Sequence, residues 1–252
     1  MARFDGKVAI VTGGTRGIGQ GIAQHLLREG AQVVISSRKS ETAEAAARAL
    51  DPTGERVLGV AAHNGDVAAL RALLDAAIAR FGQVDLLVNN AATNPHFGPI
   101  LTCAELQYDK IFEVDLKGYF FLAQMVAEHL IERKVPGAIV NVASIVGLKP
   151  DMAIGVYGLA KAGVIAFTRT AAKEWGAYGI RVNAVAPGVI PTRLSQMLVE
   201  TPEIREAVEA GTPLGRLGTV EEVAEAVAFL LSSQSSYTTG HVLTVAGGTV
   251  LY

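Results

Sequence analysis

VAIVTGGTRGIG, at residues 8–19, joins a short apolar run to a glycine-rich turn. The run predicts a buried strand, and the amphipathic pattern over residues 18–28 predicts a helix directly after the turn. Gly13, Gly17 and Gly19 form a GxxxGxG pattern, in which glycines permit a tight turn and close backbone approach to a ligand. Free amides and the positive end of the helix attract a pyrophosphate. We therefore predict a dinucleotide-binding turn, the alternative being a plain glycine-rich turn.

Short β-branched runs alternate with longer helical patterns along the rest of the chain. Apolar strands separated by helices predict an α/β fold with a parallel sheet covered on both faces. The seven predicted strands cover residues 8–11, 33–35, 57–60, 86–88, 139–142, 182–185 and 242–245. The predicted helices cover residues 18–28, 41–50, 67–81, 105–133, 156–175 and 220–231. Thr219 and Glu222 form a capping box before the last helix.

Nothing in the sequence divides the chain, because it has no Pro/Ser-rich linker, charge block or internal repeat. We therefore predict a single domain over residues 1–252. The most irregular part is residues 187–218, which contain four prolines. A long loop with its own helix at the carboxyl end of a strand is often a lid, and we place this lid at about residues 189–215.

Composition and charge exclude several classes of protein. A chain of 252 residues that is 50% hydrophobic can bury a substantial core. Its 22 basic and 24 acidic side chains give a net charge of −2, so no global field attracts nucleic acid or an anionic membrane. Cys103 is the single cysteine, which excludes an internal disulfide and suits the reducing cytosol. No apolar run has the length of a signal peptide or membrane span, so we predict a cytoplasmic protein.

The end of the second predicted strand indicates which dinucleotide binds. NAD enzymes usually carry an acidic residue there, whereas residues 35–39 read ISSRK. No carboxylate would repel a 2′-phosphate, and Ser37, Arg38 and Arg16 of the glycine turn could hold one. We predict NADP(H) as the cofactor, the alternative being that both arginines are solvated surface charges.

Three reactive side chains lie further along the chain. Tyr157 and Lys161 stand four residues apart, on one face of a predicted helix, so the Lys161 charge can favour the Tyr157 phenolate. Ser144 ends the apolar run at residues 138–144. A phenol, an ammonium and a hydroxyl that converge suit carbonyl reduction, although a YxxxK spacing alone is also common on solvated helix faces.

Five motifs together resemble the short-chain dehydrogenase/reductase family. They are TGGxxGxG at 12–19, NNAA at 89–92, Ser144, YxxxK at 157–161 and PGxxxT at 187–192. The match covers nearly the whole chain in order, and spaced motifs are far more specific than any one of them. The resemblance implies a Rossmann-type doubly wound sheet of seven parallel strands, usually assembled as a homotetramer.

The resemblance also implies a role for each reactive residue. Tyr157 is the general acid when a ketone is reduced and the base when an alcohol is oxidised, Ser144 binds the substrate oxygen, and Lys161 holds the nicotinamide ribose. Lys161 beside an oxidised nicotinamide would lower the pKa of Tyr157. The expected cofactor-binding residues are Gly13, Thr15, Arg16, Gly17, Ile18, Gly19, Ser37, Arg38, His63, Asn64, Asn90, Ala91, Tyr157, Lys161, Pro187, Gly188, Ile190 and Thr192. Ordinary turns are the alternative at residues 89–90 and 187–188.

One residue departs from the family pattern. In many relatives a helix asparagine holds a water that relays protons to the lysine, and the matching position here is Asp115. Asp can accept the hydrogen bond of the water, but its negative charge opposes a lowered pKa of Tyr157. We expect Asp115 to anchor the relay water as a further catalytic residue, the alternative being a purely structural hydrogen bond.

The cofactor edge and the substrate pocket are less specific. His63 and Asn64 replace the Asp-Val that relatives often carry near the adenine, and His63 is either a cofactor contact or a surface residue. With NPHFG at residues 94–98, it resembles a branch of NADPH-dependent carbonyl and retinal reductases. The expected substrate pocket comprises Ser144, His96, Phe97, Leu194, Met197 and Leu198. The lid residues could instead pack on the body of the protein or on a neighbouring subunit.

These patterns predict an NADPH-dependent oxidoreductase that reversibly reduces a small or medium apolar ketone, diketone or ketoester to a secondary alcohol. One alternative is a 3-oxoacyl-carrier-protein reductase, which needs a basic patch such as Arg193, Arg205 and Arg216 could offer. Another is an NADPH-binding regulatory protein with little turnover. We expect no nucleic-acid or membrane partner, and no metal site, because the five histidines are scattered.

Overall fold

The computed structural model describes residues 2–250 and contains a sheet of seven parallel strands in the order β3-β2-β1-β4-β5-β6-β7. The strands are β1 (Val8–Val11), β2 (Gln32–Ser37), β3 (Val57–Ala61), β4 (Leu86–Asn89), β5 (Gly137–Val142), β6 (Ile180–Pro187) and β7 (Val242–Val245). All seven predicted strands are confirmed. The chain winds outward from β1 to β3, returns to β4 beside β1, and winds the other way, which is the predicted Rossmann-type topology. The carboxyl ends of β1 and β4 therefore form the topological switch point where ligands bind in such sheets.

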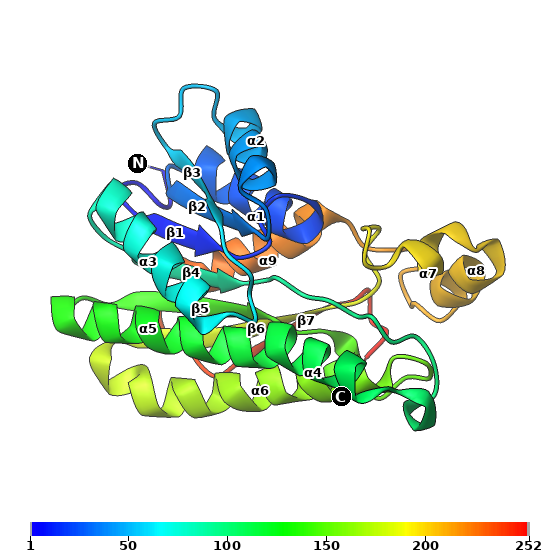
Figure 1. Cartoon of the computed structure of the whole chain (residues 1–252). Helices are drawn as coiled ribbons and strands as arrows, with labels where there is room; N and C mark the ends of the chain where they lie inside the picture. The colour runs from blue at the N-terminus through cyan, green and yellow to red at the C-terminus, as the bar shows by residue number, and fades with distance from the viewer. Residues whose placement is uncertain (1, 251–252) are drawn as a thin grey trace.

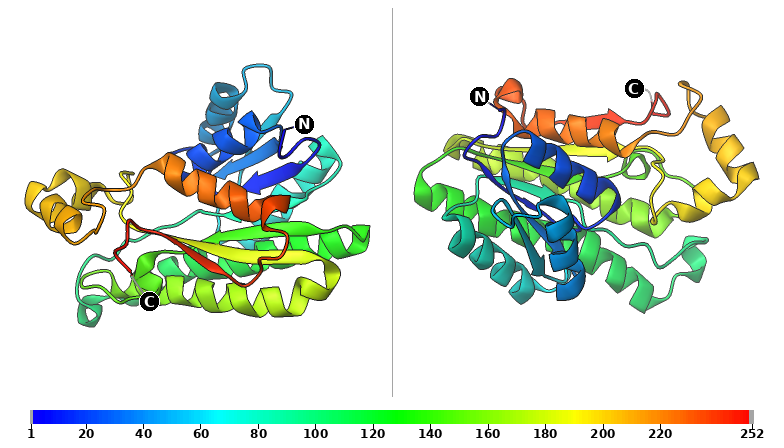
Figure 2. Two further views of the ribbon diagram at one scale, coloured as in Figure 1. Left: turned by 180° about the vertical axis from the view of Figure 1, so that it is seen from behind. Right: turned by 90° about the horizontal axis from the view of Figure 1, so that it is seen from above.

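Helices cover both faces of the sheet (Figures 1 and 2). One layer contains α1 (Gly17–Arg28), α2 (Ser40–Leu50) and α9 (Val220–Leu231). The opposite layer contains α3 (Val67–Phe81), α4 (Glu105–Phe112), α5 (Gly118–Arg133) and α6 (Gly155–Trp175). Short 3₁₀ turns lie at η1 (Ile100–Thr102), η3 (Ile145–Gly147), η4 (Gly176–Tyr178) and η5 (Ser233–Ser235).

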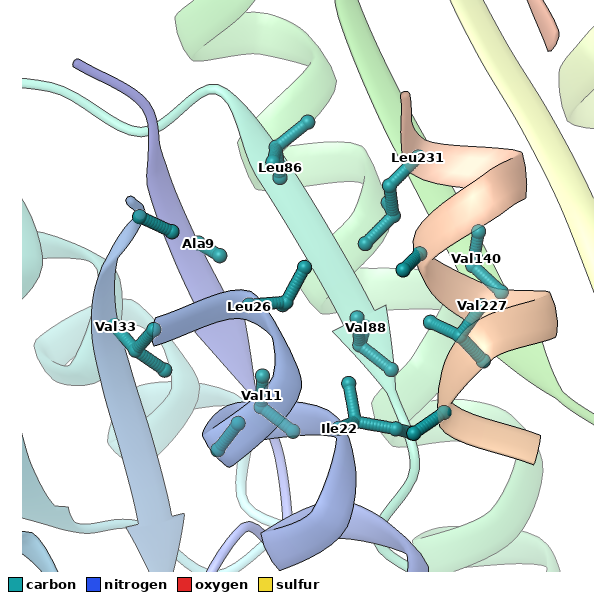
Figure 3. Packing of buried hydrophobic residues seen from close by; sticks show 14 of the residues in the cluster. Ala9, Val11, Ile22, Leu26, Val33, Leu86, Val88, Val140, Val227 and Leu231 are labelled. Carbon is teal, nitrogen blue, oxygen red and sulfur yellow. The ribbon is translucent and has the colours of Figure 1, made fainter. Parts of the chain in front are cut away.

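Successive strand residues face opposite layers, as the pleat requires. Ala9 and Val11 of β1 pack against α1 and α9, while Ile10 between them packs on the opposite face. Figure 3 shows Ile22 of α1 and Val227 of α9 among these strand side chains. Because both faces are covered, most strand positions are apolar, and each strand therefore contains a short apolar run that can be recognised in the sequence.

The helix predicted over residues 105–133 is wrong in one respect. It is divided by a π-helical turn, η2 (Glu113–Lys117), in which the backbone N–H of Gly118 donates to the carbonyl of Glu113, five residues back. The Asn64 amide donates to the carbonyl of Val114 at 2.6 Å, so a group from the loop after β3 binds within this turn. The hydrophobic period on either side stays helical, and the sequence pattern therefore hides the extra residue.

The predicted lid contains two helices rather than one. They are α7 (Gln196–Glu200) and α8 (Pro202–Ala210), and both project from the body beyond the carboxyl ends of the strands (Figure 1). Neither helix has a buried residue. Pro202 stands at the first position of α8, where its fixed φ favours a helix and its missing N–H costs nothing.

Two smaller observations complete the fold. The capping box before α9 is confirmed, because Thr219 Oγ1 accepts from the Glu222 N–H at 3.2 Å and Glu222 Oε2 accepts from the Thr219 N–H at 2.8 Å. Within residues 2–250 no helix is both long enough and apolar enough to cross a membrane.

The π-helical turn makes a specific demand on Gly118. Gly118 and Gly176 both have right-handed helical backbone angles, but a Cβ on Gly118 would overlap the backbone oxygen of Asn64, whereas one on Gly176 would meet no atom within 4 Å. We expect Gly118→Ala to lower the free energy of unfolding by about 1–3 kcal/mol through overpacking. Gly176→Ala is the matched control and should be neutral or slightly stabilising. Urea denaturation measures both, and equal midpoints for the two variants would contradict this account.

Candidate active site

The glycine turn is tied to the end of β4 by one hydroxyl group. Thr12 Oγ1 accepts hydrogen bonds from the backbone N–H of Asn90 at 2.9 Å and of Ala91 at 3.1 Å. In return, the Asn90 side-chain amide donates to the Thr12 carbonyl at 2.8 Å. Gly13 has φ +64°, and a Cβ there would come within 3.0 Å of the Ala91 Cα. The predicted residues Gly13, Asn90 and Ala91 therefore form one rigid unit at the switch point.

The amino end of α1 can receive an anion. Its N-cap residue, Arg16, is extended and exposed and makes no side-chain cap hydrogen bond, so the first amides of the helix are free. Gly17 has φ +54°, and a Cβ there would lie 3.3 Å from Thr192 Cγ2. The glycine turn and the segment 187–192, far apart in the sequence, thus meet in the structure. Both fit the backbone of a dinucleotide.

A cationic rim follows the ends of β2 and β3. Arg38 is exposed, and Lys110 of α4 places its Nζ 2.8 Å from His63 Nε2. The Gly65 N–H donates to His63 Nδ1 at 3.1 Å. Burial, followed by the charges of Lys110 and Arg38, lowers the pKa of His63, so the imidazole is neutral at physiological pH. Neutral His63 leaves Arg38 and Lys110 as the cations of this rim, and Lys110 Nζ also lies 3.9 Å from Glu113 Oε2.

The two predicted residues after β3 have different surroundings. His63 is half-buried on the cationic rim, where a cofactor can reach it. Asn64 is buried, and its side chain points inward to the π-helical turn rather than to the switch point. The Asn64 side chain therefore points away from the predicted cofactor site. Only the Asn64 backbone lies in the loop that carries His63.

Ser144, Tyr157 and Lys161 come from two adjacent elements. Ser144 directly follows β5 and caps the 3₁₀ turn η3, its Oγ accepting from the Val146 N–H at 3.4 Å. Tyr157 and Lys161 stand one turn apart on α6, with Lys161 Nζ 5.4 Å from the Tyr157 ring centroid. A Cβ on Gly147 would lie 2.7 Å from the Lys161 carbonyl carbon, so η3 packs directly on α6. This close packing brings the three predicted residues to one end of the sheet.

The Lys161 ammonium is enclosed by protein acceptors. Lys161 is 1% exposed, and its Nζ donates to the Tyr119 hydroxyl at 3.2 Å and to the Val142 carbonyl at 3.1 Å. Asp115 Oδ2 forms an ion pair with Nζ at 3.5 Å, and Asp115 Oδ1 accepts from the Thr93 N–H at 2.8 Å. The structure thus brings Asp115 to Lys161, and it adds Tyr119 and Thr93, which the sequence did not indicate.

Burial dominates the proton affinities of this site. It raises the pKa of Asp115 to about 6, with the Lys161 charge limiting the rise. It lowers the pKa of Lys161, which Asp115 partly restores. Burial and then the Asp115 charge raise the pKa of Tyr157, so the protein alone does not lower it as the family pattern suggested. Tyr157 is therefore a protonated phenol at neutral pH, the form that can donate a proton.

The residues expected around the substrate are less closely assembled. His96 is buried within its own loop, where its Nε2 bonds the Pro99 carbonyl at 3.1 Å. Phe97, Leu194 and Met197 are each about half exposed, and Leu198 is half-buried. None of these four side chains is fully buried. Within the described part of the chain, no group of three or more His, Cys, Asp or Glu side chains is placed to hold a metal ion.

Comparison with known proteins extends over nearly the whole chain. A family model described as enoyl-(acyl carrier protein) reductase matches residues 13–250. Tropinone reductase-like 3 of Erythroxylum coca is 41% identical over 247 residues, covering 98% of this chain and 94% of that protein. A short-chain dehydrogenase/reductase of Arabidopsis thaliana is 40% identical over 246 residues, covering 98% and 95%.

A solved structure is also similar to this chain over almost its whole length. A short-chain type dehydrogenase/reductase from Mycobacterium marinum superposes with a TM-score of 0.92 at 29% identity, covering 99% of this chain and 97% of that one. Sequence relatives, solved structure and site geometry agree over the full length of the sheet. This protein belongs to the short-chain dehydrogenase/reductase family.

Proposed function

We propose that this protein is an NADPH-dependent oxidoreductase that reduces an apolar ketone to a secondary alcohol and catalyses the reverse oxidation. The observation that carries this proposal is the placement of Tyr157 above the enclosed Lys161 ammonium, at the same end of the sheet as the free amides of α1. Membership of the family makes it an oxidoreductase acting on carbonyl and alcohol groups. The name of one relative, tropinone reductase-like 3, refers to the reduction of tropinone, a ketone.

The residues of this chain account for cofactor binding, substrate binding and proton transfer, but not for the supply of hydride. Bound NADPH would supply the hydride, held by the amides of α1 and by the segment 187–192. Ser144 would donate a hydrogen bond to the substrate oxygen, where negative charge develops. Tyr157, protonated at neutral pH, would then give its proton to that oxygen. Lys161 would hold the ribose hydroxyls and stabilise the phenolate that remains.

The choice of NADPH rests on the absence of a carboxylate at the end of β2 and on the charges around it. Ser37 there donates to the Lys39 carbonyl at 2.9 Å, and Arg38 is exposed beside it. Lys110 adds a second cation to the same rim, although Glu113 offsets part of its charge at 3.9 Å. A 2′-phosphate would meet donors and positive charge here, whereas a plain ribose hydroxyl would find no carboxylate to accept from it.

The acyl-carrier alternative keeps one observation in its favour, the description of the matching family model. The lid argues against it. Arg205 pairs with Glu209 at 2.9 Å, and Arg216 pairs with Glu222 at 2.6 Å. Two of the three arginines that could attract an acidic carrier are therefore already neutralised, so we place simple ketones first.

We further propose a cytoplasmic homotetramer, which exposed apolar residues of α4 and α5, Leu106 and Phe120, would suit.

A substrate panel with a Tyr157→Phe control tests the proposal. Wild-type protein should oxidise NADPH with simple ketones and much less with acyl-carrier thioesters. Tyr157→Phe removes only the proton donor, so kcat should fall by about 10²–10⁴-fold while NADPH still binds. Tyr178→Phe, which removes an exposed hydroxyl, should keep full activity. Tight NADPH binding without turnover on any ketone would favour the regulatory protein instead.

Cofactor preference is measured separately, by the dissociation constants of NADPH and NADH. Wild-type protein should bind NADPH more tightly. Arg38→Ser should weaken NADPH binding by about tenfold or more and leave NADH nearly unchanged, because hydrogen bonds to a charged phosphate are lost. Arg48→Ser removes another exposed arginine, from α2, and serves as the control. Equal affinities of the wild type for the two cofactors would reject the assignment.

Asp115 should appear in the pH profile of ketone reduction. As the pH rises through about 6, Asp115 ionises and its charge further raises the pKa of Tyr157, which makes Tyr157 a weaker acid. We therefore expect kcat of the wild type to fall across this range. Asp115→Asn cannot ionise and should lose the step, while Glu113→Gln, an exposed neighbour in the same turn, should retain it. A step that survives in Asp115→Asn must come from another group.

A further inference from the structure

The Lys161 ammonium contacts a tyrosine, Tyr119, that has no role in the proposed reaction. Tyr119 is fully buried in α5, one helical turn beyond Asp115. Its ring centroid lies 4.7 Å from Lys161 Nζ, and its hydroxyl accepts a hydrogen bond from that nitrogen at 3.2 Å. The same hydroxyl donates to the Val142 carbonyl at 3.3 Å.

The direction of these hydrogen bonds is determined by chemistry. Burial and the charge of Asp115 raise the pKa of Tyr119 well above its usual value, so the phenol stays protonated. Its single proton goes to the Val142 carbonyl, and an ammonium can only donate. The phenol oxygen must therefore accept from Lys161. Val142 also accepts from Lys161 at 3.1 Å, which its carbonyl oxygen can do with its second lone pair.

Each element packed around Lys161 contributes one acceptor. Asp115 comes from the π-helical turn, Tyr119 from α5 and the Val142 carbonyl from β5, while Tyr157 lies on α6 with Lys161 itself. These are the groups that face the ammonium. Only Asp115 carries a negative charge, and at 3.5 Å it is the longest of the three contacts. The two neutral acceptors lie closer, at 3.2 and 3.1 Å, and share the positioning of the ammonium with Asp115.

We propose that Tyr119 is a positioning residue for Lys161: its hydroxyl holds the ammonium in place beside Tyr157 and keeps it protonated in this buried site. The proposal rests on the proposed function, in which Lys161 acts on the cofactor and on Tyr157. Burial lowers the pKa of Lys161, and an acceptor that bonds the charged form more strongly than the neutral amine opposes this. Removal of the Tyr119 hydroxyl leaves one N–H of a buried cation without its partner.

The test measures the charge of Lys161 directly. In protein labelled with [¹⁵N]lysine, the Nζ resonance of Lys161, identified by its loss in Lys161→Met, is titrated in wild type and in Tyr119→Phe. This variant keeps the ring and removes only the hydroxyl. We expect the titration midpoint of Lys161 to fall by about one pH unit. The alkaline limb of kcat/KM for ketone reduction should move down by the same amount, a shift that lost packing alone would not produce.

Control variants separate positioning from packing. Tyr108→Phe removes a partly exposed hydroxyl from α4 and should leave both midpoints unchanged. If Tyr119→Phe does not fold, Tyr119→Met replaces it, because its flexible apolar side chain fills the space without an acceptor. An unchanged Lys161 midpoint in the folded variant overturns the proposal. The resonance needs no turnover, so a wild type inactive on ketones would reject the proposed function and still decide the role of Tyr119.

Discussion

A buried ammonium is the constraint around which this site is built. Lys161 is almost fully enclosed, and an enclosed cation is tolerated only when acceptors surround it. The strand β5 supplies a backbone carbonyl, α5 a phenol and the π-helical turn a carboxylate. The π-helical turn itself requires a glycine at position 118 and an amide from Asn64. Sheet, helix and loop are thus connected through the charge of one side chain.

The fold was largely predictable because each buried strand is a separate apolar run and each helix has its own period. The pattern could not reveal the π-helical turn, since an additional residue in the turn leaves the helical period intact on both sides. It also missed α8, a nine-residue helix whose short apolar stripe of Ile204, Ala207 and Val208 contains no buried residue. Pro202 after a threonine was a usable signal for its start.

In the candidate site, too, some features could be predicted from the sequence and others could not. Residues bound by backbone geometry, such as Gly13, Asn90 and Thr192, were found from motifs because turns and close contacts demand particular residue types. Tyr119 was not found, because a tyrosine within an apolar helix has the same pattern as a core residue. The raised pKa of Tyr157 also lay beyond the sequence, since desolvation depends on everything packed around the ring.

The hydroxyl of Thr12 has a consequence for the order in which the chain becomes competent. It joins residues 78 positions apart, so the glycine turn receives its support only after β4 has docked beside β1. During synthesis, the first strand, turn and helix leave the ribosome long before residue 90 does. A nascent chain of that length carries every glycine of the motif, yet it lacks the anchor that shapes the turn. A dinucleotide that needs this turn could therefore bind to, and stabilise, only molecules whose central strands are already paired.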